Sequence, residues 1–290
     1  MRENTEIDAL IQLLDDPDPT IYGHVEEKLK SIGQPVIPVL ESAWETQTLG
    51  VEFQSRVEKI IHTIQFEGLK DAFAHWKNSK DQNLLEAIIL IAKYQYPELD
   101  EEKIHKDLEK IEQDIWIELN NNLTALEQIR VINHVLYDLH NFSGNTSNYH
   151  DPKNSFINIV LETKKGNPIS LSIIYMIIAQ RLKLPVFGVN LPRHFVLAYC
   201  GNDELLNHLA NGHDKVMFYI NPFSQGGVFS KKEIDQFIAQ LKIESNPVFT
   251  DPCDNLSIVS RVLNNLHFSY TKLGYTDKVA EIEQLQKVVA

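Results

Sequence analysis

Three residues that could form a nucleophilic hydrolase site follow one another along the chain: Ser170, His194 and Asn221. Ser170 lies at the start of the apolar segment 169–182, which predicts a buried helix, and helix N-termini stabilise anions through their unpaired N–H groups. His194 opens one strand-like segment and Asn221 closes another. Cysteine hydrolases hold a thiolate at a helix start against a histidine base that an Asn or Asp orients. No cysteine stands at this helix start.

Serine replaces a thiol poorly, because its hydroxyl is far less acidic and a helix dipole alone does not activate it. Ser170 therefore acts as a nucleophile only if the ring of His194 comes within hydrogen-bond reach. Ser170 also suits a helix cap, in which its oxygen satisfies a backbone N–H group. His194 can likewise be a buried histidine paired to a carbonyl group. The sequence leaves catalysis and capping open, and it favours capping for Ser170.

The elements that would position these residues form an α+β pattern over 97–250. The runs "PVFGVN", "HFVLAYC" and "VMFYIN" are short, apolar and rich in β-branched and aromatic residues, which predicts strands. The helix predicted at 169–182 is apolar on all sides and should be central. A long helix on an antiparallel sheet is therefore expected, with "GNDELLNHLANGHDK" as a hairpin extension between the last two strands.

Residues 1–96 are predicted to form an all-helical domain. Thr5 and Asp8 form a capping-box pattern, "DPDP" interrupts the helix after it, and the next helix ends at Gly33 before a proline-started helix. This order resembles a HEAT-type helical repeat, and a generic helical bundle is the alternative. The charged segment 97–118 predicts a helix that links the domains or caps the second one.

Residues 251–290 are predicted to form two helices joined at 272–277. Their pattern of leucine, tyrosine, glycine and alanine resembles one tetratricopeptide unit. A single unit cannot bury its own apolar face. We therefore expect this helix pair to dock on the preceding domain.

The composition excludes several partners. The chain of 290 residues carries 40 acidic against 27 basic residues, a formal net charge of −13, which argues against binding to nucleic acid or to an anionic membrane. The first residues lack the apolar run of a signal peptide, and no apolar stretch is long enough to span a membrane. Two cysteines, Cys200 and Cys253, fit a reducing compartment. A cytoplasmic protein is expected.

Other residues are weaker candidates for binding a metal ion or a phosphate group. His208 and His213 flank "LANG", with Asp214 beside them, but their spacing matches no familiar metal site. No glycine-rich phosphate loop is present, because "GQPVIP" and "SQGGVF" lack the required lysine and spacing. The sequence therefore predicts neither a metal nor a cofactor.

Four motifs in a fixed order resemble one known family. "NS", "GNPISLS", "PRHF" and "PFSQGG" are similar to motifs of the bacterial transglutaminase-like family named after the Salmonella invasion regulator Sir B-one. The resemblance covers about residues 120–290, since those relatives also carry a tetratricopeptide-like tail. It implies a fold of the transglutaminase and papain-like superfamily, with no assigned biochemical activity.

Aligned on that resemblance, the chain departs from a catalytic pattern. Pro168 stands where the cysteine would be, and proline cannot be a nucleophile. Asn221 replaces the usual aspartate, which papain-like enzymes tolerate. Arg193 replaces the glycine before the histidine, where a long cation disfavours imidazolium and can also bind a carboxylate. Asn154 and Ser155 fall next to the cleft, although Asn-Ser at a loop–helix junction is also an ordinary cap.

Three functions follow as hypotheses. The first is a non-catalytic protein that binds a protein or peptide on a degenerate transglutaminase-like domain, with no nucleic-acid or membrane partner. The second is a serine-based hydrolase or acyl transferase that acts on a peptide or amide bond through Ser170, His194 and Asn221. The third is a structural scaffold whose cleft is filled by side chains.

Overall fold

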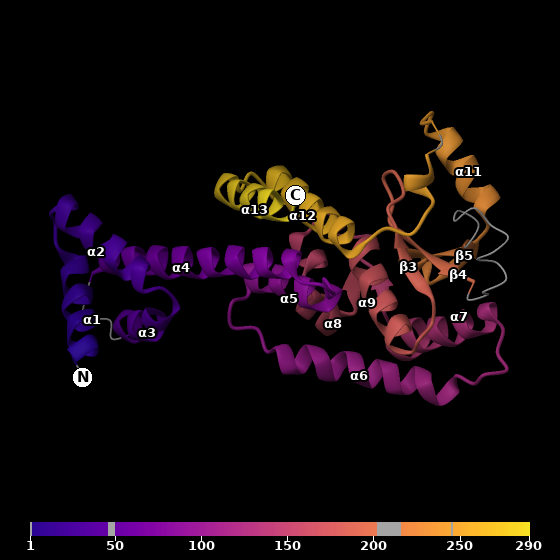
Figure 1. Ribbon diagram of the computed structural model, residues 1–290, viewed down its shortest axis with the longest axis horizontal. Coiled ribbons are helices and arrows are strands. Elements are labelled where there is room, and N and C mark those ends of the chain that lie inside the picture. Colours follow the sequence, from indigo (N-terminus) through magenta and orange to yellow (C-terminus); the bar gives the residue numbers. More distant parts are fainter. Residues whose placement is uncertain (1, 46–49, 202–215, 245) are drawn as a thin grey trace. The chain divides into compact units, whose positions relative to one another are not determined.

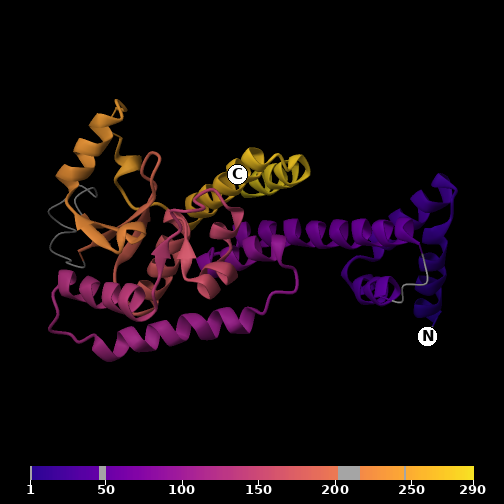
Figure 2. The same ribbon diagram turned by 180° about the vertical axis from the view of Figure 1, so that it is seen from behind.

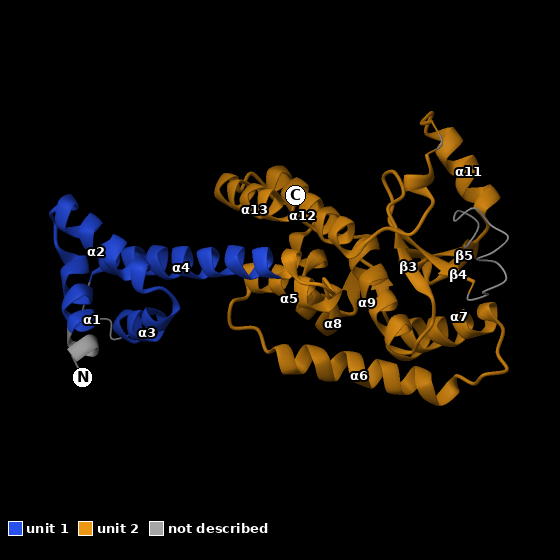
Figure 3. Cartoon of the chain, viewed as in Figure 1, with its two compact units in different colours: residues 1–75 blue, residues 76–290 orange. Residues whose placement is uncertain are grey.

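The computed structural model describes residues 2–45, 50–201, 216–244 and 246–290. It is a helix-rich mixture of helices and two small sheets, which confirms the mixed class predicted from the sequence. The chain divides into two compact units, Met1–His75 and Trp76–Ala290 (Figure 3). The predicted division at 1–96, 97–250 and 251–290 concerns independent domains and stays a prediction.

The first unit is helical and is built around one apolar cluster that includes Leu14, Leu29, Leu40 and Ile60. The predicted break at "DPDP" is present, since one helical stretch ends at Asp15 and the next begins at Pro19. The predicted start at Thr5 is wrong, because the first helix already begins at Arg2. The helices are α1 (Arg2–Gln12), η1 (Leu13–Asp15), α2 (Pro19–Ile32), η2 (Gln34–Val36), α3 (Ile37–Glu45) and α4 (Val51–Asn78), which continues past the unit boundary.

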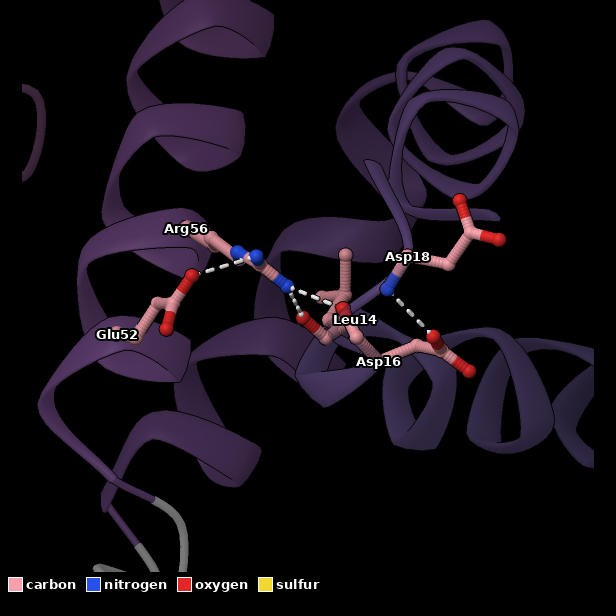
Figure 4. A network of polar contacts seen from close by, with 5 residues as sticks. All are labelled: Leu14, Asp16, Asp18, Glu52 and Arg56. Atoms are coloured by element: carbon pink, nitrogen blue, oxygen red, sulfur yellow. Dashed lines mark hydrogen bonds and ion pairs between the residues drawn. The ribbon is translucent and has the colours of Figure 1, made fainter. Parts of the chain in front are cut away.

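Arg56 of α4 fixes the turn between α1 and α2 (Figure 4). Its Nη1 donates to the carbonyl oxygens of Leu14 at 2.7 Å and Asp16 at 2.9 Å, and its Nη2 lies 2.6 Å from Oε1 of Glu52. These carbonyls lie at the C-terminal end of η1, where the last carbonyl groups of a helix have no backbone donor within it. The arginine thus satisfies the polar groups that the proline-rich turn leaves unpaired.

The second unit begins with helices that surround its core. Thr124 and Glu127 form a capping box at the start of α7, and a π-helical segment follows it. The predicted helix at 97–118 is present as α6. These elements are α5 (Leu84–Gln95), α6 (Glu101–Glu118), α7 (Ala125–Asn133), η3 (His134–Leu139), η4 (Pro152–Ser155) and α8 (Ile157–Thr163).

Helix α9 (Pro168–Arg181) is the centre of the second unit, as its apolar sequence predicts. Every residue from Ile169 to Ala179 is buried. It contacts α6, α8, α12 (Asn255–Leu273) and strands of the sheet, and both views place it between α12 above and α6 below (Figures 1 and 2). Burial on all sides explains why this helix shows almost no polar face.

The main sheet is antiparallel with strand order β3-β4-β5-β6, and the three strands predicted from the sequence are all present. Val196, Ala198 and Cys200 of the central strand face a cluster that includes Ile234 and Ile238 of α11. The alternate residue Tyr199 faces α7, where its hydroxyl donates to Gln128. The strands are β3 (Val186–Val189), β4 (Val196–Cys200), β5 (Val216–Asn221) and β6 (Gly227–Phe229), and β1 (Ser143–Gly144) pairs in parallel with β2 (Lys165–Gly166).

After the sheet, the described residues form α11 (Lys231–Gln240), the short turn η6 (Pro247–Phe249), α12 (Asn255–Leu273) and α13 (Thr276–Val289), while the short turn η5 (Pro222–Ser224) lies between β5 and β6. Helix α12 ends at Gly274, whose φ of +77° is the left-handed conformation typical of a helix stop. It packs against α13, α5, α9 and η4. The hydroxyl of Tyr94 on α5 donates to Glu281 of α13 at 2.7 Å, which ties the last helix to this unit.

Candidate functional site

The start of α9 is closed by a reciprocal set of hydrogen bonds. The backbone N–H of Ser170 donates to Oδ1 of Asn167 at 2.9 Å. The hydroxyl of Ser170 accepts from the backbone N–H of Asn167 at 3.0 Å and lies 3.2 Å from its carbonyl oxygen. Pro168 occupies the first helical position, where its missing N–H costs nothing. Ser170 therefore serves as half of a capping box, the role that its position favours.

Two buried polar residues that precede α9 in the chain, Asn154 and Ser155, hold the Asn167 amide and the loop before α8 in place. Ser155 is buried and accepts a hydrogen bond from Nδ2 of Asn167 at 3.0 Å. Asn154 is also buried: it accepts from Asn145 at 2.8 Å and donates to the carbonyl oxygen of Asn148 at 2.8 Å. The expectation that Asn154 and Ser155 cap the following helix is wrong, because Phe156 precedes α8 and caps it with no side-chain bond. They fix the preceding loop and the Asn167 amide instead.

His194 lies just before β4 and faces α11. Its ring meets the ring of Phe237 edge to face, with centroids 5.1 Å apart. The residue is exposed, but loss of solvent on its packed side, followed by the positive charge of Arg261, lowers the pKa of His194 below its ordinary value of 6.5. Within the described ranges, the imidazole makes no hydrogen bond, either to Ser170 or to Asn221. The ring is held neutral at pH 7 without a partner that would orient it as a base.

Arg193 adopts a left-handed backbone conformation with φ of +63°. Such a conformation suits glycine, the residue that the resemblance places before the histidine, and it costs other residues about 1 kcal/mol. Arg193 is exposed. The left-handed backbone therefore explains why the family pattern has glycine at this position. Arg193 adopts the same conformation with some backbone strain, just before β4.

Arg261 of α12 is a second cation near His194, and the sequence did not single it out. Its Nη1 donates to Oδ1 of Asn190 at 2.9 Å, and burial lowers the pKa of its guanidinium. No carboxylate lies within ion-pair distance of it in the part of the chain that the structure describes. Because 67 residues separate it from His194, only the packing of α12 brings its charge to that ring. Arg261 lies close enough to His194 to lower its pKa, and the exposed Arg193 directly precedes His194 in the chain; these three residues are called the cationic face below.

Asn221 is occupied by its own turn. Its Oδ1 accepts from the backbone N–H of Phe223 at 3.1 Å, and its Nδ2 lies 3.2 Å from the hydroxyl of Ser224. The amide therefore caps η5 instead of orienting an imidazole. The structure places Ser170, Asn221 and His194 in three separate arrangements, two of them local caps.

Gly226, the first glycine of "PFSQGG", has a packing role. Gly226 has φ of +69°, and a Cβ atom there would lie 2.0 Å from Oδ1 of Asn133. Asn133 donates to the carbonyl oxygen of Gly226 at 3.0 Å and accepts from the hydroxyl of Tyr175 on α9 at 3.0 Å. This partly buried chain of bonds ties the β5–β6 turn to the central helix. The motif is explained by structure without invoking catalysis.

Neither cysteine is activated as a nucleophile. Cys253 is a free thiol whose pKa is raised to about 11, mainly by burial and then by the nearby charge of Asp254. A thiol with that pKa stays protonated at neutral pH, and it is the thiolate that attacks. Cys200 is buried within the sheet.

The candidate metal ligands His208, His213 and Asp214 lie outside the described residues, as does nearly all of the predicted hairpin extension. Elsewhere in the described ranges, no three His, Cys, Asp or Glu side chains gather closely enough to hold a metal ion. None of the helices in those ranges combines the length and the apolarity that crossing a bilayer requires.

Comparisons with known proteins relate the chain to one superfamily and to several proteins. The family model described as the transglutaminase-like superfamily matches residues 102–264. A UPF0162 protein of Xylella fastidiosa (strain 9a5c) is 27% identical over 211 residues, which are 68% of each chain. A UPF0162 protein of Vibrio cholerae is 25% identical over 183 residues, 62% of this chain and 63% of that protein. F-box only protein 21 of Mus musculus is 36% identical over 109 residues, 38% of this chain and 17% of that protein. No solved structure matches the chain.

Proposed function

We propose, since the chain belongs to the transglutaminase-like superfamily, that it is a non-catalytic protein that binds a protein or peptide segment on this fold. Within the superfamily, we place it in the group named after the regulator Sir B-one on the four motifs quoted above. The binding segment would be held at the cationic face, next to His194.

One observation carries the proposal: the hydroxyl of Ser170 is held inside a helix cap, while His194 packs on Phe237. A serine nucleophile needs its hydroxyl within hydrogen-bond reach of a base. Activating Ser170 would require breaking both bonds to Asn167, and Pro168 before it offers no reactive atom. The geometry therefore supports binding over catalysis.

The chemistry of the cationic face suggests what is bound. Arg261 has five N–H donors and uses one on Asn190, and Arg193 extends the positive charge at the surface. A partly buried guanidinium without a carboxylate gains most from an acidic partner, because charge-assisted bonds are the strong ones. We infer that the bound segment presents an aspartate, a glutamate or a C-terminal carboxylate to Arg261.

The flanking helices would assist this role. We propose that the first unit is a HEAT-like repeat and that α12 and α13 are a tetratricopeptide-like pair, with α12 supplying Arg261. Helical repeats of both kinds are used for protein recognition. In this arrangement the tail completes the cationic face instead of forming a peptide-binding superhelix of its own.

The serine hydrolase and the scaffold remain as alternatives with distinct outcomes. The hydrolase requires a conformation in which Ser170 leaves its cap and meets His194. The scaffold requires that the cationic face bind nothing at all. Affinity capture separates the scaffold from the proposal, and covalent labelling of Ser170 separates the hydrolase from it.

The test is affinity capture from the cell that makes the protein, with four baits: wild type, Arg193→Gln, Arg193→Gln with Arg261→Gln, and Lys287→Gln. Lys287 is an exposed cation on α13, so its variant controls for the lost charge. We expect a stoichiometric partner on wild type and on Lys287→Gln, and about tenfold less on the double variant. Arg193→Gln alone, at an exposed position, should show part of this loss without any folding defect. A partner retained equally by all baits, or none at stoichiometric level, contradicts the proposal.

A further inference from the structure

A polar cavity of about 400 Å³ lies at the far end of α9, away from the capped serine. Three segments line it: the end of α6 and the loop after it, α7, and the last turn of α9. The side chains that matter are Glu112, Trp116, Gln128, Arg181 and Lys183. Its volume falls in the range of sites for small molecules. The sequence did not indicate it, because its walls come from positions up to 72 residues apart.

Two cations at this cavity are incompletely paired. Nη1 of Arg181 lies 3.6 Å from Oε2 of Glu112, which is within ion-pair distance but too long for a hydrogen bond. Among the described residues, the guanidinium of Arg181 makes no hydrogen bond and Lys183 forms no ion pair. The cavity thus holds two positive charges against one negative charge, in a chain whose net charge is −13. An anion entering here would meet donors that are still available.

Two uncharged side chains of the cavity, Trp116 and Gln128, would determine how a ligand is oriented. Trp116 leaves 69% of its surface exposed, so its ring offers a flat apolar face at the rim. The amide of Gln128 is fixed because its Oε1 accepts from the hydroxyl of Tyr199 at 2.7 Å. Its Nε2 has only a long contact of 3.4 Å to the carbonyl oxygen of Leu123 and can still donate. A ligand with a planar ring and an anionic group would use both kinds of wall.

We propose that this cavity is a binding site for a small aromatic anion. The ring stacks on Trp116 while a carboxylate or phosphate lies between Arg181 and Lys183, with Gln128 donating to the ligand. The site lies apart from the cationic face and does not depend on the proposed function. It gives the chain a small-molecule ligand in addition to any protein partner.

The test uses the indole N–H signals of the protein in two-dimensional proton–nitrogen NMR. The chain has three tryptophans, and Trp116→Phe assigns the signal of interest. Trp44, in the first unit, and Trp76, whose indole donates to Asn83, serve as internal references. The probes are adenosine 5′-monophosphate, whose phosphate is joined to planar adenine through the ribose, and 2-naphthoate, whose carboxylate is attached directly to a planar ring. Adenosine and inorganic phosphate supply each half alone.

We expect at least one of the two aromatic anions to shift the Trp116 signal saturably with a Kd of about 1 mM or tighter, leaving the references in place. Adenosine and phosphate should bind at least about tenfold more weakly. Arg181→Gln and Lys183→Gln should each weaken binding by about tenfold, while Lys287→Gln should not. The proposal is overturned if neither aromatic anion shifts Trp116, if adenosine binds as well as its monophosphate, or if Arg181→Gln leaves the Kd unchanged.

Discussion

The two ends of α9 differ in whether their polar groups have hydrogen-bond partners within the protein. At its N-terminal end, Asn167, Ser170 and Ser155 satisfy one another within a buried cap. At its C-terminal end, Arg181 and Lys183 line a cavity of about 400 Å³, and these two side chains still have N–H donors available for a ligand. The end that matches an active-site motif is closed, and the end without a motif is open. A motif can therefore persist because it folds the helix correctly, and sites are better located by polar groups that remain unsatisfied.

The largest effect is expected at the β5–β6 turn, which is bonded through Asn133 to Tyr175 of α9. Gly226→Ala should destabilise the protein by about 3 kcal/mol, because the new Cβ would meet Asn133 and left-handed φ penalises alanine. Urea unfolding measures the loss. Gly227→Ala is the matched control, since its Cβ would meet only the carbonyl oxygen of Ser224 at 3.4 Å. Equal effects of the two variants would show that Asn133 and its bonds to Tyr175 do not constrain the turn.

A second prediction compares the two ends directly. Asn167→Ala should cost about 2 kcal/mol, because it removes the cap acceptor for the Ser170 N–H and the buried donor to Ser155. Arg181→Gln should change the free energy of unfolding by no more than about 0.5 kcal/mol, as its ion pair is long and partly exposed. Chemical denaturation of both variants measures this difference. Similar losses at the two ends would remove the distinction between a closed and an open end.

A third prediction concerns His194. Arg261→Gln removes the cation near the ring, so the pKa of His194 should rise toward 6.5, as read from the imidazole proton signals during a pH titration. The folded pKa lies below the unfolded one, so the unfolded chain binds more protons and stability falls as the pH drops below about 6.5. That acid-side loss should be smaller in the variant. An unchanged pKa would mean that Arg261 does not act on the cationic face.

The smallest effect is expected at the open end. Lys183 has φ of +61°, so Lys183→Gly should stabilise the protein by about 0.5 kcal/mol through relief of backbone strain. Lys183→Ala keeps the strain and serves as the control. Thermal unfolding should give a higher midpoint for the glycine variant than for the alanine variant. If the midpoint of the glycine variant is no higher, the backbone of Lys183 is not strained in the folded protein.

Much of the fold was predictable because local signals and tertiary packing agree. Helix α9 and strands β3, β4 and β5 follow from apolar runs bounded by Gly, Pro and Asn. Strand β6 was missed because three residues, mostly exposed, leave no periodicity. Helix α11 was missed although Ser230 and Glu233 form a capping box that the sequence displays.

The candidate site was predictable only in part. The caps of Ser170 and Pro168 are local, and the sequence favoured them. The charge of Arg261 at His194 and the cavity at Arg181 were not predictable, because they depend on how distant helices pack and no spacing rule encodes that packing. The roles of Asn154 and Ser155 were misjudged for the same reason, since their partners lie in a loop and in the next cap.

The central claim is that Ser170 is a structural cap and not a nucleophile. Mass spectrometry after treatment with a fluorophosphonate tests it directly, with wild type and His194→Ala handled in parallel. The account predicts that Ser170 stays unmodified in both proteins. An adduct on Ser170 that forms in wild type and is lost in His194→Ala would contradict it.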